Sequence, residues 1–261
     1  MNGIELNDAD LAAELAYAAG QLLLNVRASG LVTGKALGKA GDATANQFLV
    51  HALREQRRQD GLLSEEEKDN FARLDQSRVW IIDPVDGTRE YGEARADWAV
   101  HIGLAVDGVP VLGAVALPGA DNGQGMVYRS DAPIALPPAP ETLRMVVSRT
   151  RPAAEAVFVA EQLGAQLVPM GSAGAKAMAI IRGEADIYLH SGGQYEWDSC
   201  APVAVALAHG LHCSRIDGSP LIYNQRDTYL PDLLICRPEH AEQVLTLIRQ
   251  AGTSIPKNKR G

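Results

Sequence analysis

The chain lacks several features that would place it in common classes of protein. None of the apolar runs among its 261 residues reaches membrane-spanning length, and the N-terminus MNGIELNDADLAAEL is too acidic for a secretory signal. No stripe of lysine and arginine is visible, and a formal charge of -8 argues against binding to nucleic acid. We therefore expect a cytoplasmic protein that binds neither nucleic acid nor a membrane.

Cysteine is also scarce. Cys200, Cys213 and Cys236 are an odd number, and their spacing matches neither a zinc site nor a thioredoxin motif. Free thiols in a reducing compartment are expected. With 46% hydrophobic and 21% charged residues, the composition is that of an ordinary globular protein.

The first half of the chain predicts helices packed on a largely antiparallel sheet. Apolar residues recur at helical spacing after Asn7 and Asp8, either of which can cap a helix. A second helix is expected to begin at Asp42, a favourable N-cap residue. Strand patterns follow in VWII, WAVHIGLAV and VPVLGAVAL, and Asp107-Gly108 between the last two predicts a tight hairpin.

A proline-rich connector, DAPIALPPAP, indicates a boundary between an N-terminal α+β domain (1–135) and a C-terminal α/β domain (136–261). Beyond it, strand signals in LRMVVS, AQLVPM, ADIYLH and LLICR alternate with helix signals that start at Pro152, Ser172, Ser199 and Pro238. This alternation favours a mixed or parallel sheet with helices on its faces.

The stretch WIIDPVDGTREY carries the strongest chemical signal. A strand pattern runs directly into Asp83 and Asp86, whose like charges are costly to desolvate unless a cation lies between them. Oxygen ligands, including the Val85 carbonyl, favour a hard cation such as Mg²⁺. Gly87 and Thr88 are expected to open a helix whose free N–H groups can hold an anion.

Further acidic residues also follow apolar elements. Glu65 and Glu66 lie in GLLSEEEKDN, and Asp198 lies in YEWDSCAP, where it is expected to cap the helix that begins at Ser199. Each position alone has an ordinary explanation, since Asp before a helix is usually a cap and a run of Glu is usually solvated. Together with DPVDGT they predict one acidic cleft.

LLSEE, WIIDPVDGTREY and YEWDSCAP, in this order and spacing, resemble the three metal-binding motifs of the inositol monophosphatase superfamily of Mg²⁺-dependent, Li⁺-sensitive phosphatases. DPVDGTRE is most similar to the DPLDGTKE pattern of the 3′(2′),5′-bisphosphate nucleotidases, especially the CysQ type, and WDSCAP is similar to their WDTCAP. The resemblance runs from about Leu11 to Arg237. It implies an α/β (α+β) fold, layered α-β-α-β-α as in inositol monophosphatases and fructose-1,6-bisphosphatases.

The resemblance also implies a role for each matching position. It places two or three Mg²⁺ ions, with Li⁺ as an inhibitor, on Glu65, Asp83, the Val85 carbonyl, Asp86 and Asp198. It implies a catalytic role for Asp42, Glu65 and Thr88, with Asp42 and Thr88 helping to deprotonate the water that attacks phosphorus. It implies substrate contacts from Asp86, Gly87, Thr88, Gly171, Ser172, Lys176 and Asp198.

The reaction implied is hydrolysis of the 3′-phosphate of adenosine 3′,5′-bisphosphate to give AMP, as part of sulfate assimilation. 3′-Phosphoadenosine 5′-phosphosulfate is a second candidate substrate, and inositol 1-phosphate and fructose 1,6-bisphosphate are alternatives within the superfamily. A catalytically silent sensor of a phosphorylated metabolite is the alternative of a different class. Whether the protein forms a homodimer is open.

Some positions keep two interpretations. Three residues of VVSRTRP either contact the second phosphate or the adenine, or belong to the surface: Ser148, Arg149 and Arg151. Tyr195 and Trp197 are candidates for the base pocket, with core packing as the alternative for Trp197.

The stretch GKALGKAGD departs from the longer loop that family members commonly carry before the position of Asp42, which leaves a third metal site undecided. It is not a P-loop either, because the glycine spacing is one short and Ala40 stands where Ser or Thr must bind Mg²⁺.

Overall fold

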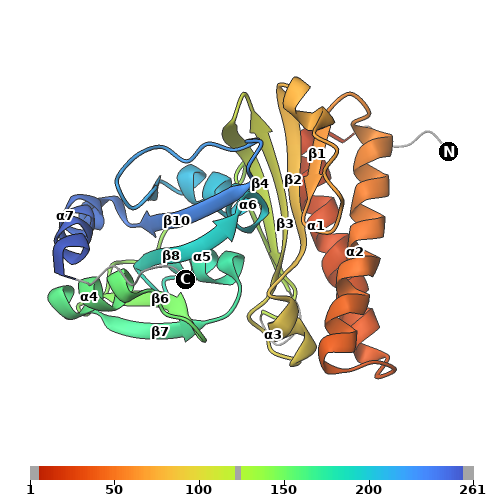
Figure 1. Ribbon diagram of the computed structural model, residues 1–261. Helices are drawn as coiled ribbons and strands as arrows, with labels where there is room; N and C mark the ends of the chain where they lie inside the picture. The colour runs from red at the N-terminus through yellow and green to blue at the C-terminus, as the bar shows by residue number, and fades with distance from the viewer. Residues whose placement is uncertain (1–5, 121–124, 255–261) are drawn as a thin grey trace, which may run out of the picture.

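The computed structural model describes residues 6–120 and 125–254. Its first half forms one five-stranded sheet and two long helices (Figure 1). The helices are α1 (Asp8–Ala28) and α2 (Gly34–Gln56). The strands, in spatial order, are β1 (Gly61–Ser64), β2 (Arg78–Asp86), β3 (Ala99–Val106), β4 (Val109–Leu117) and β5 (Met126–Arg129). β1 and β2 are parallel and the other neighbours are antiparallel. The sheet is therefore largely antiparallel, as the sequence predicted.

The second half forms another five-stranded sheet, and this one is mixed. Its strands, in spatial order, are β7 (Gln166–Met170), β6 (Arg144–Ser148), β8 (Ile187–Tyr195), β10 (Tyr229–Cys236) and β9 (His212–Ser214). Its helices are α4 (Ala154–Leu163), α5 (Ala173–Ile181), α6 (Glu196–Ala208) and α7 (Pro238–Ser254). Two short elements belong to the first half, η1 (Ala72–Asp75) and α3 (Thr88–Gly92).

The elements stack in five layers (Figure 1). α1 and α2 cover the outer face of the first sheet, α5 and α6 lie between the two sheets, and α4 and α7 cover the outer face of the second. This is the α-β-α-β-α arrangement that the family resemblance implied. Among the described residues, no helix combines the length and the apolar character that crossing a membrane requires.

Strand β2 shows why the sheet is covered on both faces. Successive side chains of a strand point to opposite faces, so an apolar run such as VWII supplies two cores at once. Trp80 and Ile82 belong to the core beneath α1 and α2. Val79 and Ile81 belong to the core beneath the middle helices. β2 is therefore buried from Val79 to Asp86, and its last residues lie at the boundary between the layers.

Several local predictions are confirmed. Asn7 caps α1, since its side chain accepts a hydrogen bond from the Asp10 N–H. Asp107 and Gly108 both have positive φ, 49° and 80°, and join β3 to β4 in a two-residue hairpin of the type that requires left-handed residues. All three cysteines are free.

The predicted start of the second helix is wrong. α2 begins at Gly34 and Asp42 lies inside it, so Asp42 is not an N-cap. Tertiary contact explains the difference, because the first turns of α2 pack closely on α3. A Cβ on Gly38 would lie 2.8 Å from Thr88 Cγ2, and one on Gly92 would lie 2.6 Å from the Gly34 carbonyl oxygen. The glycines that suggested a P-loop therefore allow two helices to approach.

The start of α6 also differs from the prediction. The helix begins at Glu196, not Ser199, so Asp198 lies in the first turn, where its side chain accepts a hydrogen bond from the Tyr195 N–H at 2.6 Å. The first sheet ends at Arg129 and the second begins at Arg144, on either side of the predicted connector. The middle core contains residues from both halves, and the division into two domains stays a prediction.

Candidate active site

Three carboxylates meet where the layers adjoin. Asp83, Asp86 and Asp198 each offer one oxygen, and these oxygens lie within 4.8 Å of one another. The first two lie at the end of β2, where pairing with β3 shifts register between Asp83 and Asp86 and so bends the strand. Asp198 comes from the first turn of α6. Residues far apart in the sequence thus form one acidic group, which we call the carboxylate cluster.

The electrostatics of the cluster show an excess of negative charge. Burial, followed by repulsion from Glu65, Asp86 and Asp198, raises the pKa of Asp83 well above its ordinary value. Burial and repulsion from Asp86 raise the pKa of Asp198 to about 6. Both shifts have the sign expected where like charges are held together without enough compensation. A divalent cation with oxygen ligands would relieve this repulsion.

Glu65 follows β1, and its N–H donates to the Ile82 carbonyl oxygen at 3.3 Å. Its carboxylate is not one of the three that lie within 4.8 Å, and the residue keeps contact with solvent. Even so, desolvation and repulsion from Asp198 raise the pKa of Glu65 to about 7. The charges of the cluster therefore act on Glu65, which lies at the solvent-exposed side of the cluster.

Thr88 joins the cluster to α2. Its hydroxyl oxygen lies 3.1 Å from both Asp42 Oδ1 and the Val85 carbonyl oxygen and can donate to either. Burial and the charge of Glu66 raise the pKa of Asp42 to about 6, while the bond from Thr88 lowers it. The predicted pairing of Asp42 with Thr88 is therefore present in the geometry, although Asp42 lies in the middle of a helix.

Asp86 is tied to the start of α5 as well as to the cluster. Its carboxylate accepts hydrogen bonds from the Ser172 hydroxyl and from the N–H groups of Ala173, at 3.1 Å, and Gly174, at 2.7 Å. Burial alone would raise the pKa of Asp86, but His101, Ser172 and Lys176 together hold it well below the ordinary value. Asp86 is thus ionised and anchored across the two halves of the chain.

His101 is a residue that the sequence analysis missed. It is completely buried in β3, with Nε2 at 3.1 Å from Asp86 Oδ2 and Nδ1 at 3.1 Å from the Trp197 carbonyl oxygen. Burial lowers the pKa of His101, but the charge and hydrogen bond of Asp86 raise it more. The available signal was a single imidazole in the otherwise apolar strand WAVHIGLAV.

The MGSAGAKAM segment lies beside the cluster, but its members take different positions. The Gly171 N–H donates to Asp97 Oδ2 at 2.7 Å, and Ser172 binds Asp86. Lys176 is buried, and its Nζ donates to the Ser172 carbonyl oxygen at 2.6 Å. Desolvation lowers the pKa of Lys176, although several carboxylates oppose the shift. Lys176 therefore stabilises the backbone of the segment from its buried side.

Arg149 pairs with Glu90 at 2.7 Å and with Glu93 at 3.0 Å, so its charge is already compensated within the protein.

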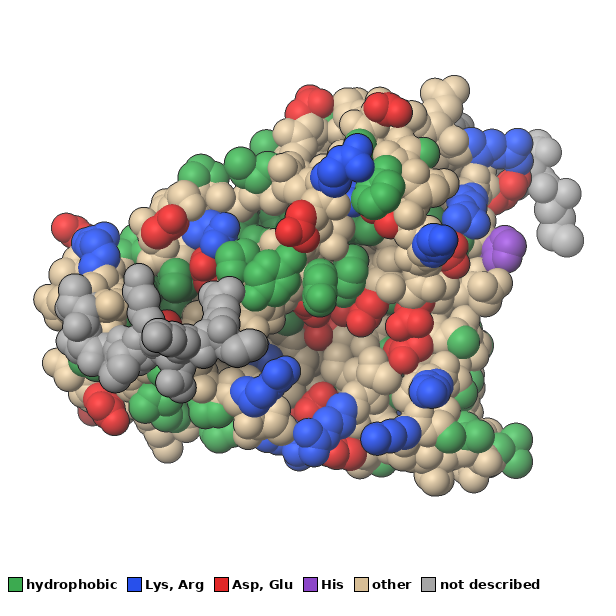
Figure 2. Space-filling view, viewed as in Figure 1, with side chains coloured by type: hydrophobic (Ala, Val, Ile, Leu, Met, Phe, Trp, Pro, Cys, Tyr) green, Lys and Arg blue, Asp and Glu red, His purple; other side chains and the backbone are tan. Residues whose placement is uncertain are grey.

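Figure 2 shows how charged side chains are distributed over the visible face. Acidic side chains gather in its hollowed centre, and lysine and arginine side chains lie along the edge below them. Such a surface suits a ligand with two phosphate groups, one bound through a metal ion at the acidic centre and the other bound by lysine or arginine side chains at the edge.

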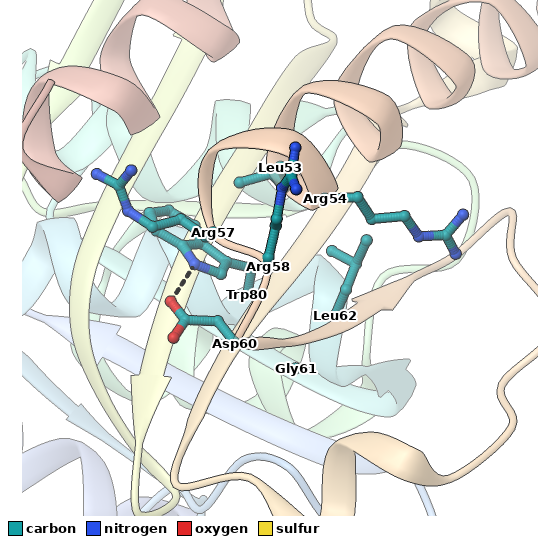
Figure 3. A pocket seen from close by; sticks show the side chains of 8 residues that line it. All are labelled: Leu53, Arg54, Arg57, Arg58, Asp60, Gly61, Leu62 and Trp80. Carbon is teal, nitrogen blue, oxygen red and sulfur yellow. Dashed lines mark hydrogen bonds between the residues drawn. The ribbon is translucent and has the colours of Figure 1, made fainter. Parts of the chain in front are cut away.

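A separate pocket of about 270 Å³ lies at the far end of α2 (Figure 3). It is lined by Leu53, Arg54, Arg57, Arg58, Asp60, Gly61, Leu62 and Trp80. Its arginines pair with carboxylates, such as Arg57 with Asp8 at 2.7 Å, and Asp60 accepts a hydrogen bond from the Trp80 indole at 2.9 Å. These contacts tie α1, α2 and β2 together, so we interpret the pocket as structural.

The layered fold and the carboxylate cluster define a class of phosphatase-like proteins, and the chain belongs to the inositol monophosphatase family, whose model matches residues 7–253. Over 246 residues it is 53% identical to the 3′-phosphoadenosine 5′-phosphate phosphatase of Mycobacterium bovis, covering 89% of this chain and 90% of that one. Over 260 residues it is 50% identical to the protein of the same name from Mycobacterium leprae, covering 94% and 95%. The crystal structure of CysQ from Bacteroides thetaiotaomicron matches with a TM-score of 0.74 at 25% identity, covering 88% and 97%. The resemblance seen in the motifs is confirmed.

Proposed function

We propose that the protein is a Mg²⁺-dependent phosphatase that removes the 3′-phosphate of adenosine 3′,5′-bisphosphate to give AMP. The observation that carries the proposal is the carboxylate cluster, with three oxygens within 4.8 Å, beside the Thr88–Asp42 pair. Relatives of about half-identical sequence are named for this substrate, which supports the choice of nucleotide. 3′-Phosphoadenosine 5′-phosphosulfate remains a second candidate.

The donor set fits a hard divalent cation. It consists of carboxylate oxygens, and burial together with repulsion from neighbouring carboxylates raises the pKa values of Asp83 and Asp198. We assign Asp83, Asp86 and Asp198 as ligands, joined by Glu65 and the Val85 carbonyl. A bound Mg²⁺ would supply Lewis acidity for both water and phosphate. Li⁺, another hard cation, is expected to inhibit by competing for the same oxygens.

The protein's own groups position the phosphate and move a proton. Gly87, at φ 86°, turns the chain from β2 into α3, whose first N–H groups have no partner within the helix and can donate to phosphate oxygens. When Thr88 donates to Asp42, its oxygen is free to accept a hydrogen bond from the attacking water. Asp42, with a pKa of about 6, is suited to receive the proton near neutral pH.

The test is release of inorganic phosphate from adenosine 3′,5′-bisphosphate, inositol 1-phosphate and fructose 1,6-bisphosphate, compared with Mg²⁺, with a chelator, and with Mg²⁺ plus Li⁺. We expect the highest kcat/KM for the nucleotide, loss of activity with the chelator, and inhibition by Li⁺. A higher kcat/KM for either base-free substrate would refute the substrate assignment. Nucleotide binding without turnover would instead identify a sensor. A cytoplasmic role in sulfate assimilation fits the expected specificity.

A further inference from the structure

Three aromatic side chains form a partly exposed surface beside the carboxylate cluster. Tyr195 and Trp197 stack with ring centroids 4.8 Å apart and planes 10° apart. Tyr229 meets Tyr195 edge to face, with centroids 5.9 Å apart. Tyr195 is 46% exposed and Tyr229 is 41% exposed, unlike the core residues Trp80 and Trp98, which are buried. We call Tyr195, Trp197 and Tyr229 the aromatic shelf.

The local backbone holds the shelf in place. Tyr195 and Tyr229 are partners across the antiparallel pair of β8 and β10, so their side chains lie on the same face of the sheet. Gly193 has a φ of 93°, and a Cβ there would lie 2.5 Å from the ring of Tyr229. A glycine is therefore needed for Tyr229 to lie over β8. Strand pairing thus places both exposed tyrosines side by side on one face of the sheet.

The backbone that carries Tyr195 and Trp197 contacts the cluster directly. The Tyr195 N–H donates to Asp198 Oδ2 at 2.6 Å, and the Trp197 carbonyl oxygen lies 3.1 Å from His101 Nδ1. In Figure 2, large hydrophobic side chains lie next to the acidic side chains at the hollowed centre of the visible face. An uncharged aromatic surface is unusual in a site whose other groups are charged, and neither metal ions nor phosphate groups would need it.

We propose that the aromatic shelf binds the purine base of the substrate by stacking, an inference that rests on the proposed nucleotide phosphatase function. With the 3′-phosphate at the carboxylate cluster, the base is one ribose away, which matches a shelf that starts three residues before Asp198. Bases stack on exposed aromatic rings, whereas inositol and sugar phosphates have no such face. The shelf is therefore the part of the site that discriminates nucleotides from other phosphate monoesters.

A neighbouring pocket extends this surface. Tyr229 also lines a hollow of about 630 Å³ together with Arg151, Ser191 and Asp232. The Ser191 hydroxyl already donates to Glu155, and Asp232 is paired with Arg215 at 2.6 Å, which leaves the Arg151 guanidinium to bond to the polar edge of a base. This gives Arg151 a position beyond the shelf, in contrast to Arg149, which is bound to Glu90 and Glu93.

The experiment compares wild type with Tyr195→Ala, Tyr195→Phe and Tyr229→Ala. Tyr17→Ala is the matched control, since Tyr17 is 52% exposed on α1 in the outer layer. For each protein, kcat/KM is measured for adenosine 3′,5′-bisphosphate and for inositol 1-phosphate. Affinity for AMP, which carries the base but no 3′-phosphate, is measured separately by quenching of tryptophan fluorescence, with ribose 5-phosphate as the base-free control.

We expect Tyr195→Ala to lower kcat/KM for the nucleotide by roughly ten- to a hundredfold and to weaken AMP binding similarly, with kcat/KM for inositol 1-phosphate unchanged within about twofold. Tyr195→Phe, which keeps the ring, should stay close to wild type. Unchanged AMP affinity and nucleotide kcat/KM in both alanine variants would overturn the shelf. A wild type that prefers inositol 1-phosphate would refute the proposed function, and the AMP titration would still decide whether the shelf binds a base.

Discussion

At Thr88, a single substitution can remove the hydroxyl group and still keep the volume of the side chain. Its hydroxyl lies 3.1 Å from Asp42 Oδ1 and from the Val85 carbonyl oxygen, and its methyl group faces Gly38. Thr88→Val keeps the volume and removes the hydroxyl that, in the proposed mechanism, passes a proton to Asp42. We expect kcat to fall by roughly 10²- to 10⁴-fold with a smaller change in KM, measured as phosphate release at saturating Mg²⁺.

Thr88→Ser is the matched variant, because it keeps the hydroxyl and loses only the methyl group. It should retain most of the wild-type kcat, and both variants should unfold within a few degrees of wild type. If Thr88→Val kept the wild-type kcat, proton transfer through Thr88 would be ruled out.

At the same scale, the predictable part of the site is the part that is local in sequence. Asp83, Asp86 and Thr88 lie within six residues, so their chemistry could be recognised from the order of residue types. The contact of His101 with Asp86 could not, because it depends on the register of β2 against β3. The bond from Ser172 to Asp86 joins two halves of the chain and has no local pattern either.

Among the elements, α1, α2 and β2 are joined by an ion-pair network that centres on Asp8. Asp8 pairs with Arg57 at 2.7 Å and with Arg78 at 2.8 Å. Partial burial acts to raise the pKa of Asp8, but the two arginines outweigh it and the pKa is lowered. A lowered folded-state pKa means that the stabilisation is present above the unfolded pKa of 3.8 and is lost as pH falls through the folded value.

We therefore expect Asp8→Asn to destabilise the protein at pH 7 by about 1 kcal/mol, through loss of the ion pairs and of a negative charge at the start of α1. The difference in melting temperature from wild type should shrink as pH falls below 3.8. Thermal unfolding followed by circular dichroism at several pH values measures both effects. Glu14→Gln, an exposed position on the same helix, is the control. A pH-independent difference would exclude the ion pairs as the cause.

The elements also show where patterns in the sequence stop being sufficient. The long helices and strands have clear apolar periods, and most of them were predicted. The predicted start of α2, Asp42, lies eight residues after the true start, Gly34, because contact with α3 extends the helix beyond the capping signal. That contact is visible only once the glycines are seen to face Thr88 and Gly92. Tertiary packing therefore overrode the local signal.

For the whole molecule, the alternation of apolar elements was enough to predict layers of helices and sheets, but not that β2 and α6 would bring their acidic residues to one point. That meeting depends on α6 packing between the sheets, against β2, β3 and β4 on one side and β8 and β10 on the other. The order of the layers therefore determines where the carboxylate cluster forms. Folding itself brings the negative charges of Asp83, Asp86 and Asp198 together.

Metal removal should for this reason affect the stability of the whole fold and not activity alone. A cation held by the carboxylate cluster would bind the folded state, in which the three carboxylates are together, and would have little affinity for the unfolded chain. At about 100 times its Kd, Mg²⁺ should stabilise the protein by about 2.7 kcal/mol, a rise of roughly 5–10 °C in melting temperature over the chelator-treated protein. Asp83→Asn removes one carboxylate from this group, which we propose as metal ligands, so it should remain folded but lose the rise along with turnover. Differential scanning calorimetry of both proteins, with Mg²⁺ and with chelator, measures this. Equal melting temperatures of wild type in the two conditions would contradict metal binding at the cluster, whatever the activity data showed.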